Sequence, residues 1–176
     1  MIRASLAIAF FAATTIGASA DPVERAYRAL MQVREVETID VMGDTDHQIG
    51  VAAFRGLALF DDGEVALHRY EGGFDLTDGS GHFYGYALWR FDDGSEITAR
   101  YEGEARAEDP NDFEVEARIA DIRGTGRFEG AVGSGTFAGK RIDPIADGGS
   151  TFLRGELTLS LPGKTEPPPE DETGAN

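Results

Sequence analysis

Cysteine is absent from the 176-residue sequence, tryptophan occurs once, and histidine occurs three times. Without cysteine no disulfide can form, so the fold has to be stabilised by packing alone. Basic residues are also scarce: 16 lysines and arginines face 32 acidic residues, a net charge of −16. This charge repels nucleic acid and anionic membranes, so neither is an expected partner, and a solvated acidic surface is the simplest interpretation. No apolar run reaches the length of a membrane-spanning helix, so no stable membrane insertion is expected.

The first twenty residues have the pattern of a targeting segment. Arg3 precedes an apolar stretch from Leu6 to Ile16, and Ala18-Ser19-Ala20 is a small-x-small cleavage site. We therefore predict a signal peptide over residues 1–20, a mature chain that begins at Asp21, and export to the periplasm or the extracellular space. The mature chain of 156 residues is suited to one domain with a substantial core.

Alternation of apolar and polar residues dominates the mature chain. In Ser95–Ala105, for example, Ile97, Ala99 and Tyr101 alternate with charged or polar residues. This period of two predicts antiparallel strands around one interior. The expected strands are Val33–Val41, Gln48–Phe60, Glu64–Gly73, Gly81–Phe91, Ser95–Ala105, Phe113–Arg123, Thr136–Ile142 and Thr151–Leu161.

Eight strands are enough to close a barrel whose interior is either filled or holds one small ligand. We therefore predict an all-β fold with a single antiparallel eight-stranded β-barrel over residues 21–161. Asp21–Gln32 is expected to be a short helix or an irregular lead-in, because Asp21-Pro22 suits a helix start. Residues 162–176 are rich in proline and acidic residues and are expected to form a disordered tail.

Two segments of the chain are near-repeats. Phe60–Gly72 (FDDGEVALHRYEG) and Phe91–Gly103 (FDDGSEITARYEG) are identical at eight of thirteen positions. Asp-Asp-Gly is a turn sequence, so each copy predicts a hairpin. The register of the repeat puts His68 in the place of Ala99, which predicts that His68 points inward.

A glycine-rich segment, Gly124–Gly139 (GTGRFEGAVGSGTFAG), holds two copies of G-x-G-x-F-x-G and predicts tight turns between strands. With the flanking strands ITARYEGEA and TFLRGELTLSL, it resembles the allene oxide cyclase and dirigent barrel superfamily, a calycin-like fold, over roughly Phe54–Leu161. The resemblance implies a barrel whose mouth receives an apolar or aromatic small molecule. Plant relatives cyclise an oxidised fatty acid or steer phenoxy-radical coupling, and bacterial relatives include cyclases. The plant cyclases use a barrel cysteine, which this chain lacks.

Four residues are the candidates for ligand binding: Arg55, His68, Trp89 and Tyr101. His68 titrates in the range that suits a general base, although an inward histidine is more often a hydrogen-bonded core residue. Arg55 interrupts an apolar run, so it either faces water at a bulge or is buried and binds an anionic group. Trp89 belongs to an aromatic run that is either core or a stacking platform for a ligand.

Three functions remain open on the sequence. The first is an exported barrel that carries a lipid-like or phenolic ligand in its lumen, with or without steering its cyclisation or coupling. The second is a barrel with a filled core that acts through its outer surface, as a homo-oligomer or with a partner. The third is a cyclase or isomerase, and no catalytic residue is assigned to it.

Small residues that face the barrel axis either let the strands crowd together or leave room for a ligand, and the sequence is compatible with both. They are Ala53, Gly85, Ala87, Ala99, Gly103, Ala105, Ala117 and Gly155. The sequence has no nucleotide-binding glycine motif and no hydrolase elbow. Its Asp-rich turns lack the spacing of calcium loops, so no metal or cofactor is expected.

Overall fold

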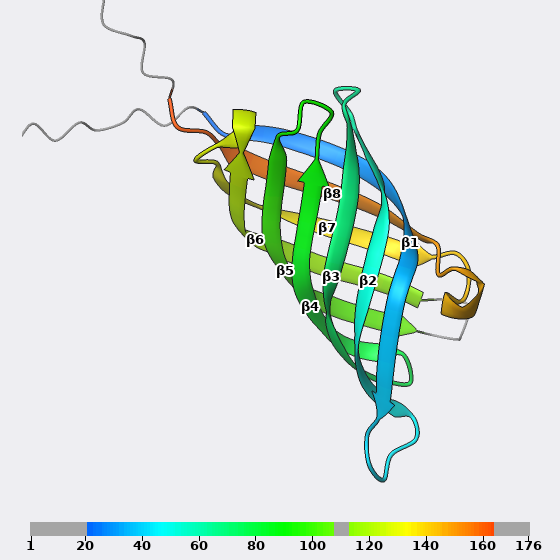
Figure 1. Ribbon diagram of the computed structural model, residues 1–176. Helices are drawn as coiled ribbons and strands as arrows, with labels where there is room; N and C mark the ends of the chain where they lie inside the picture. Colours follow the sequence, from blue (N-terminus) through cyan, green and yellow to red (C-terminus); the bar gives the residue numbers. More distant parts are fainter. Residues whose placement is uncertain (1–20, 108–112, 164–176) are drawn as a thin grey trace, which may run out of the picture.

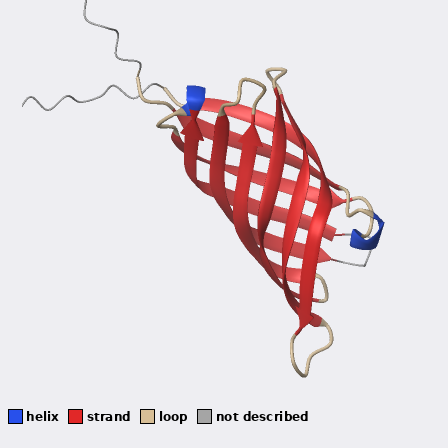
Figure 2. Ribbon diagram, in the orientation of Figure 1, coloured by secondary structure: helices blue, strands red, loops and turns tan. Residues whose placement is uncertain are grey.

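The computed structural model describes residues 21–107 and 113–163, so the expected signal peptide and the tail from residue 164 lie outside the described part. Eight antiparallel strands follow one another in sequence order around a closed barrel (Figure 1). Within these described residues, helix is limited to two short 3-10 turns at the ends of the barrel (Figure 2). The predicted all-β, eight-stranded barrel is therefore confirmed.

Each strand pairs with the next, and the last strand pairs with the first. The strands are β1 (Val23–Asp40), β2 (His47–Phe60), β3 (Val65–Thr77), β4 (Ser80–Arg90), β5 (Glu96–Ala107), β6 (Phe113–Thr125), β7 (Val132–Arg141) and β8 (Thr151–Ser160), and the 3-10 turns are η1 (Gly126–Phe128) and η2 (Ile145–Asp147). Pairing of Tyr27 in β1 with Gly155 in β8 belongs to the ladder that closes the ring. Closure gives every strand a paired neighbour on both sides, although the second half of β1, from residue 34, pairs with β2 alone.

The start of the mature chain corrects one prediction. Residues 21–32 are not a helix but the first half of β1, in which the buried Tyr27, Ala29 and Met31 alternate with the exposed Arg28 and Leu30. β1 pairs with β8 and β2 at once. These two ladders supply hydrogen bonds that an isolated helical turn could not match, so tertiary pairing overrides the helix-start signal.

The two repeats form the same hairpin at the same end of the barrel, as predicted. Phe60 N–H donates to the Glu64 carbonyl at 2.9 Å, and Phe91 N–H donates to the Ser95 carbonyl at 2.9 Å. The glycine of each Asp-Asp-Gly has a positive φ, 90° and 81°, which only glycine adopts readily. We call the end of the barrel that carries these two turns the hairpin end. The opposite end carries the loop of residues 142–150, and we call it the loop end.

Only the first half of the glycine-rich segment is a turn. η1 and the residues after it turn the chain, but Gly133, Gly135 and Gly139 lie inside β7. A Cβ on Gly133 or Gly135 would lie 2.0 or 2.2 Å from a carbonyl oxygen of β8. These glycines therefore let β7 and β8 approach closely. The expectation of a turn is wrong for residues 132–135, whereas the predicted strand Thr136–Ile142 corresponds to the rest of β7.

A bulge in β6 changes which residues face inward. Asp121 has φ of 51°, and the register of β5 and β6 shifts beside it. As a result Ile119 and Ile122, three residues apart, are both buried. The extra residue bends the strand around the barrel, as bulges commonly do.

Candidate functional site

Three of the four predicted ligand-binding residues lie together inside the barrel. His68, Trp89 and Tyr101 are almost fully buried. The inward orientation predicted for His68 is confirmed, and its ring stacks on Trp89 with a centroid distance of 4.7 Å. Arg55 is exposed on the outer face of β2, between Gln32 and Arg69 of the neighbouring strands, so it does not share the interior with the other three.

His68 is held in an apolar environment that favours its neutral form. Burial lowers the pKa of His68 to about 4, and the hydrogen bond to the Leu88 carbonyl, at 3.0 Å from Nδ1, opposes this shift only in part. Because Nδ1 faces a carbonyl oxygen, the Nδ1–H tautomer donates there. His68 is thus a neutral imidazole at pH 7 with one nitrogen occupied by the backbone.

A continuous column of aromatic rings fills the barrel axis. Tyr27 lies 5.5 Å from Phe60 and 5.7 Å from Trp89, and Tyr70 lies 6.0 Å from Tyr101. His68 joins the two groups, at 4.7 Å from Trp89 and 6.1 Å from Tyr70. Phe54, Phe83 and Phe137 contact Tyr70 or Tyr101 and continue the column toward the loop end. Such ring pairs add packing energy beyond the area they bury.

The small inward residues make room for these rings. A Cβ on Gly155 would lie 2.3 Å from the ring of Tyr27. A Cβ on Gly85 or Gly72 would lie 2.6 or 2.8 Å from the hydroxyl of Tyr101. The space left by these glycines is therefore occupied by tyrosine side chains. Ala53 is an exception to the predicted inward set, because Ala52 and Phe54 face the core and Ala53 alternates outward.

Three buried polar atoms in the described residues have no hydrogen-bond partner: the Tyr27 hydroxyl, the Trp89 indole nitrogen and Nε of Arg141. Burial raises the pKa of Tyr27, Tyr70 and Tyr101, so all three hydroxyls stay protonated. Burial also lowers the pKa of Arg141, which a neighbouring Tyr70 and Asp143 partly counteract. A buried polar atom without a hydrogen-bond partner lowers the stability of the fold, so these three atoms are the places in the interior where a bound polar group would be stabilising.

The hairpin end is closed by two arginines over three phenylalanines. Arg25 lies 4.5 Å from the centre of the Phe60 ring, and Arg127 lies 4.7 and 4.8 Å from those of Phe91 and Phe128. Phe60 and Phe91 are the first residues of the two repeats, and Phe128 lies in the glycine-rich segment. Cation–π contacts of this kind hold the two arginines over the rings and keep water out of the hairpin end of the barrel.

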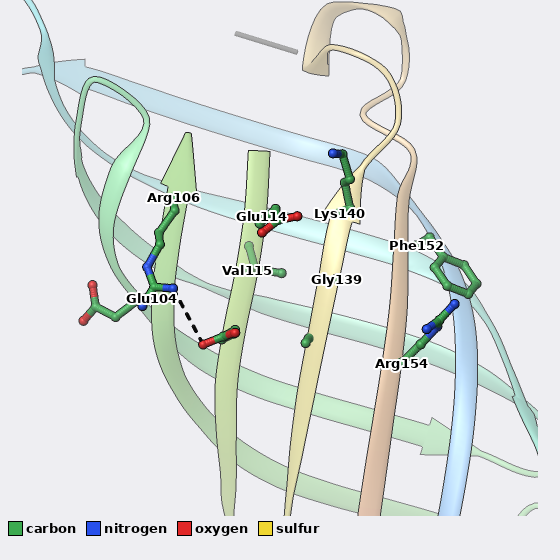
Figure 3. A pocket seen from close by; sticks show the side chains of 10 residues that line it. Glu104, Arg106, Glu114, Val115, Gly139, Lys140, Phe152 and Arg154 are labelled. Atoms are coloured by element: carbon green, nitrogen blue, oxygen red, sulfur yellow. Dashed lines mark ion pairs between the residues drawn. The ribbon is translucent and has the colours of Figure 1, made fainter. Parts of the chain in front are cut away.

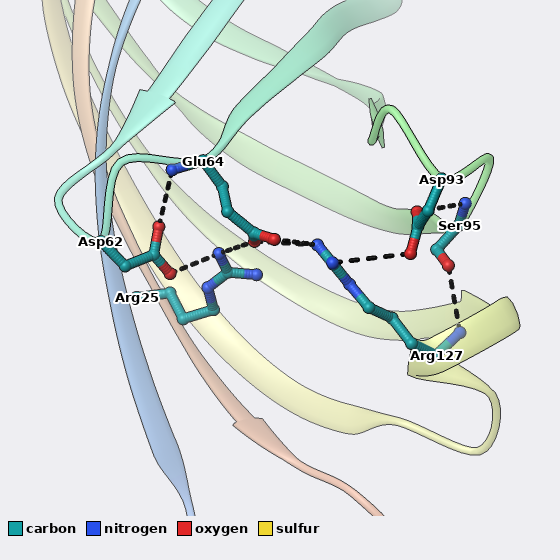
Figure 4. A network of polar contacts seen from close by, with 6 residues as sticks. All are labelled: Arg25, Asp62, Glu64, Asp93, Ser95 and Arg127. Carbon is teal, nitrogen blue, oxygen red and sulfur yellow. Dashed lines mark hydrogen bonds and ion pairs between the residues drawn. The ribbon is translucent and has the colours of Figure 1, made fainter.

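Carboxylates hold these arginines in place (Figure 4). Glu64 bridges Arg25 and Arg127, at 2.5 and 2.7 Å, and Asp62 lies 2.6 Å from Arg25. The Glu64 backbone N–H, followed by Arg25, lowers the pKa of the Asp62 carboxyl. The same geometry recurs in the second repeat, where the Ser95 N–H lowers the pKa of Asp93. The repeats thus serve to seal one end of the barrel.

Two hollows, of about 690 and 310 Å³, lie on the outer face of the barrel over β7. Residues 136–140 of β7 form their floor, and their outward side chains include the small Thr136 and Ala138. The long side chains of β6 and β8 rise on either side (Figure 3). We call this joined hollow the β7 trough. It exists because β7 carries small residues where its neighbours carry glutamate, arginine and phenylalanine.

The β7 trough carries both signs of charge. Glu104 and Glu116 face each other directly across β5 and β6, a like-charged pair that costs stability. Arg106 lies 4.0 Å from Glu116, and the His82 ring lies 3.4 Å from Glu104. Arg154 stands on the opposite side, on β8. The charged residues that line the trough are Glu102, Glu104, Glu114, Glu116, Glu156, Arg106, Arg118, Arg154 and Lys140.

Sequence reasoning missed the trough. The signal that could have revealed it is the run of small residues at alternate positions of β7, Ser134, Thr136 and Ala138. It was hidden because the strand was expected to begin only at Thr136, so Ser134 was not placed on it.

Within the described ranges, no three histidine or carboxylate side chains gather in a metal-binding arrangement. No helix in the described part of the chain has the length and apolarity to cross a membrane. Comparison with protein-family models, with curated proteins and with solved structures finds no match to this chain.

Proposed function

We propose that this protein is a non-enzymatic interaction barrel with a filled core, which binds an extended polypeptide segment in the β7 trough. The observation that supports this most is that the interior of the barrel is filled while a hollow lies on its outer face. The axis is occupied by stacked rings, whereas the hollow of about 690 Å³ lies outside over β7. A partner that binds on the outer surface can therefore enter this hollow without displacing the rings of the core.

The chemistry of the trough favours a polypeptide. Its five carboxylates and four cations nearly balance, in a chain whose net charge is −16, so it is suited to a partner that carries both signs. An extended segment points successive side chains to opposite sides. A lysine or arginine then fits between Glu104 and Glu116, and an acidic side chain fits against Arg154. The floor of five residues is about 16 Å long, the length of a five-residue extended segment.

Side-chain contacts have to supply the affinity in this proposal. Peptides often bind by adding a strand to a sheet edge, but residues 136–140 of β7, the floor of the trough, are paired with both β6 and β8 and offer no such edge. The like-charged Glu104–Glu116 pair is a cost that a cationic side chain of the partner would offset.

The test is a selection of displayed ten-residue peptides on the mature protein. We expect enriched peptides with a basic residue and an acidic residue at neighbouring positions. Ala138→Arg, which fills the trough floor, should weaken them at least ten-fold. Thr98→Arg, on the outer face of β5 away from the trough, is the matched control and should not. If no peptide is enriched, or if both variants bind equally well, the proposal is wrong.

A second candidate, a lipid-like or phenolic ligand inside the barrel, is favoured by the unpaired Tyr27 hydroxyl, Trp89 indole and Arg141 Nε. A bound ligand or ordered water would satisfy these atoms. Native mass spectrometry of the purified protein and Trp89 fluorescence titrated with fatty acids and phenolics test it. A co-purified ligand whose mass disappears in Tyr101→Phe supports the carrier. An unchanged spectrum across the panel overturns it.

Export and family membership are further parts of the proposal. The pattern of residues 1–20 supports secretion, and the mature protein should begin at Asp21 by N-terminal sequencing. The glycine-rich segment and the eight-stranded barrel support a relationship to the allene oxide cyclase and dirigent superfamily. A cyclase or isomerase would use the neutral His68 as its base, but Trp89 stacks on that ring and the Tyr27 ring lies 5.9 Å from it at a steep angle, so this function ranks third.

A further inference from the structure

An exposed apolar row crosses four neighbouring strands on the outer face and meets the β7 trough at Phe152, which lines both. Phe152 in β8 pairs with Leu30 in β1, Leu30 pairs with Leu57 in β2, and Leu57 pairs with Leu67 in β3. Leu59 and Val65, also paired, extend the row toward the hairpin end. The exposed fractions of Leu30, Leu57, Leu59 and Val65 are 52, 51, 55 and 48%. A contiguous exposed apolar surface of this kind marks an interaction site.

Arginines border the apolar row on both sides. Arg28 pairs with Arg154 toward the hairpin end, and Arg55 pairs with Arg69 toward the loop end. Like charges directly opposite each other destabilise a sheet. Arg69 lies 2.8 Å from Glu71, but Arg28, Arg55 and Arg154 form no ion pair within the part of the chain that the structure describes. The row is therefore flanked by cations that the fold itself leaves unneutralised.

We propose that this face docks on an anionic lipid surface, with the apolar row among the headgroups and the arginines on lipid phosphates. Apolar side chains flanked by arginine are the composition of interfacial membrane-binding elements. The row lies on the convex outer wall of a barrel, so a deformable surface fits it better than a rigid protein groove. A second copy in a two-fold arrangement would bring arginine against arginine.

The net charge of the chain does not prevent this contact. The paired Glu104 and Glu116 lie on β5 and β6, on the other side of the ring from β1 and β2. On the docking face itself, Glu71 and Glu156 lie two residues beyond Arg69 and Arg154, and Glu71 already binds Arg69. The arginines are therefore closer to the apolar row than these carboxylates, and salt screens charges beyond about 10 Å at 0.1 M. Phe152 and Arg154 belong to both surfaces, so the test below uses Arg28, Arg55, Leu30 and Leu57, none of which lines the trough.

Vesicle flotation of the mature full chain tests the proposal. Vesicles of phosphatidylcholine alone are compared with vesicles that contain 30% phosphatidylglycerol, at 50 and 300 mM NaCl. We expect flotation only with phosphatidylglycerol and less of it at high salt. Arg28→Gln with Arg55→Gln should reduce the partition coefficient about 25-fold, about five-fold for each arginine. Leu30→Gln with Leu57→Gln should also reduce it.

Controls separate this site from general effects. Arg28→Lys with Arg55→Lys should retain flotation, and Arg100→Gln, on β5 away from this face, should leave it unchanged. The proposal is overturned if the wild type does not float with phosphatidylglycerol, or if Arg100→Gln loses as much as the double arginine variant. Sedimentation that shows self-association abolished by the leucine variant, without flotation, would assign the face to a second copy instead.

Discussion

Lowering the pH should destabilise the fold through His68. Burial lowers the pKa of His68 to about 4, below its ordinary value of 6.5. Between these values the unfolded chain binds a proton that the folded protein excludes, so the stabilisation present above pH 6.5 is lost as the pH falls toward 4. The difference in pKa corresponds to about 3 kcal/mol, a large share of the stability of a domain of this size.

Urea unfolding of the wild type and His68→Phe at pH 7.0, 5.5 and 4.5 measures this effect. Carboxylates such as Asp62, whose pKa is lowered in the fold, affect both proteins, so the difference between the two isolates His68. The wild type should lose about 2 kcal/mol more than His68→Phe between pH 7.0 and 4.5. His82→Gln, at an exposed histidine on β4, serves as control. If wild type and His68→Phe lose stability in parallel, the histidine is not excluded from water as described.

Three further substitutions test the packing. Gly155→Ala should destabilise by about 2 kcal/mol, seen as a fall in Tm of about 4–8 °C, because its Cβ would lie 2.3 Å from the Tyr27 ring; an unchanged Tm would mean that the ring can move aside. Tyr27→Phe should be neutral or stabilise by up to about 1 kcal/mol in urea unfolding, because the hydroxyl has no partner; a clear loss would indicate a bound ligand or water. Arg25→Gln should cost about 1–3 kcal/mol in the same assay, because its buried guanidinium binds Asp62 and Glu64; no loss would contradict the role of the network as a cover.

Alternation and repetition in the sequence were sufficient to predict most of the barrel. The eight-residue identity of the repeats predicted two equivalent hairpins and the inward position of His68, because a period of two leaves no other register for a buried face. The first half of β1 was missed because Asp21-Pro22 and the spacing of Ala26 and Leu30 suit a helix locally. Only pairing with both β2 and β8 decides that segment, and such non-local pairing is not visible in a local pattern.

The candidate site was less predictable for a similar reason. Small residues such as Gly155 and Gly85 fit an open lumen or a crowded one, and the outcome depends on whether a ring from another strand packs over them. Tyr27 and Tyr101 do so here. Arg55 could not be assigned to a face until its strand register was known. The trough depends on the contrast between β7 and its neighbours, which no single strand reveals.

An NMR titration of the mature, ¹⁵N-labelled protein with a peptide selected on the wild type tests the central claim most directly. Trp89 is the only tryptophan in the chain, so its indole N–H signal reports on the interior without ambiguity. We predict that the backbone amides of Ala138 and Gly139 shift on binding while the indole signal of Trp89 stays in place. A shift of the Trp89 indole signal with unmoved β7 amides would contradict the account and place binding inside the barrel.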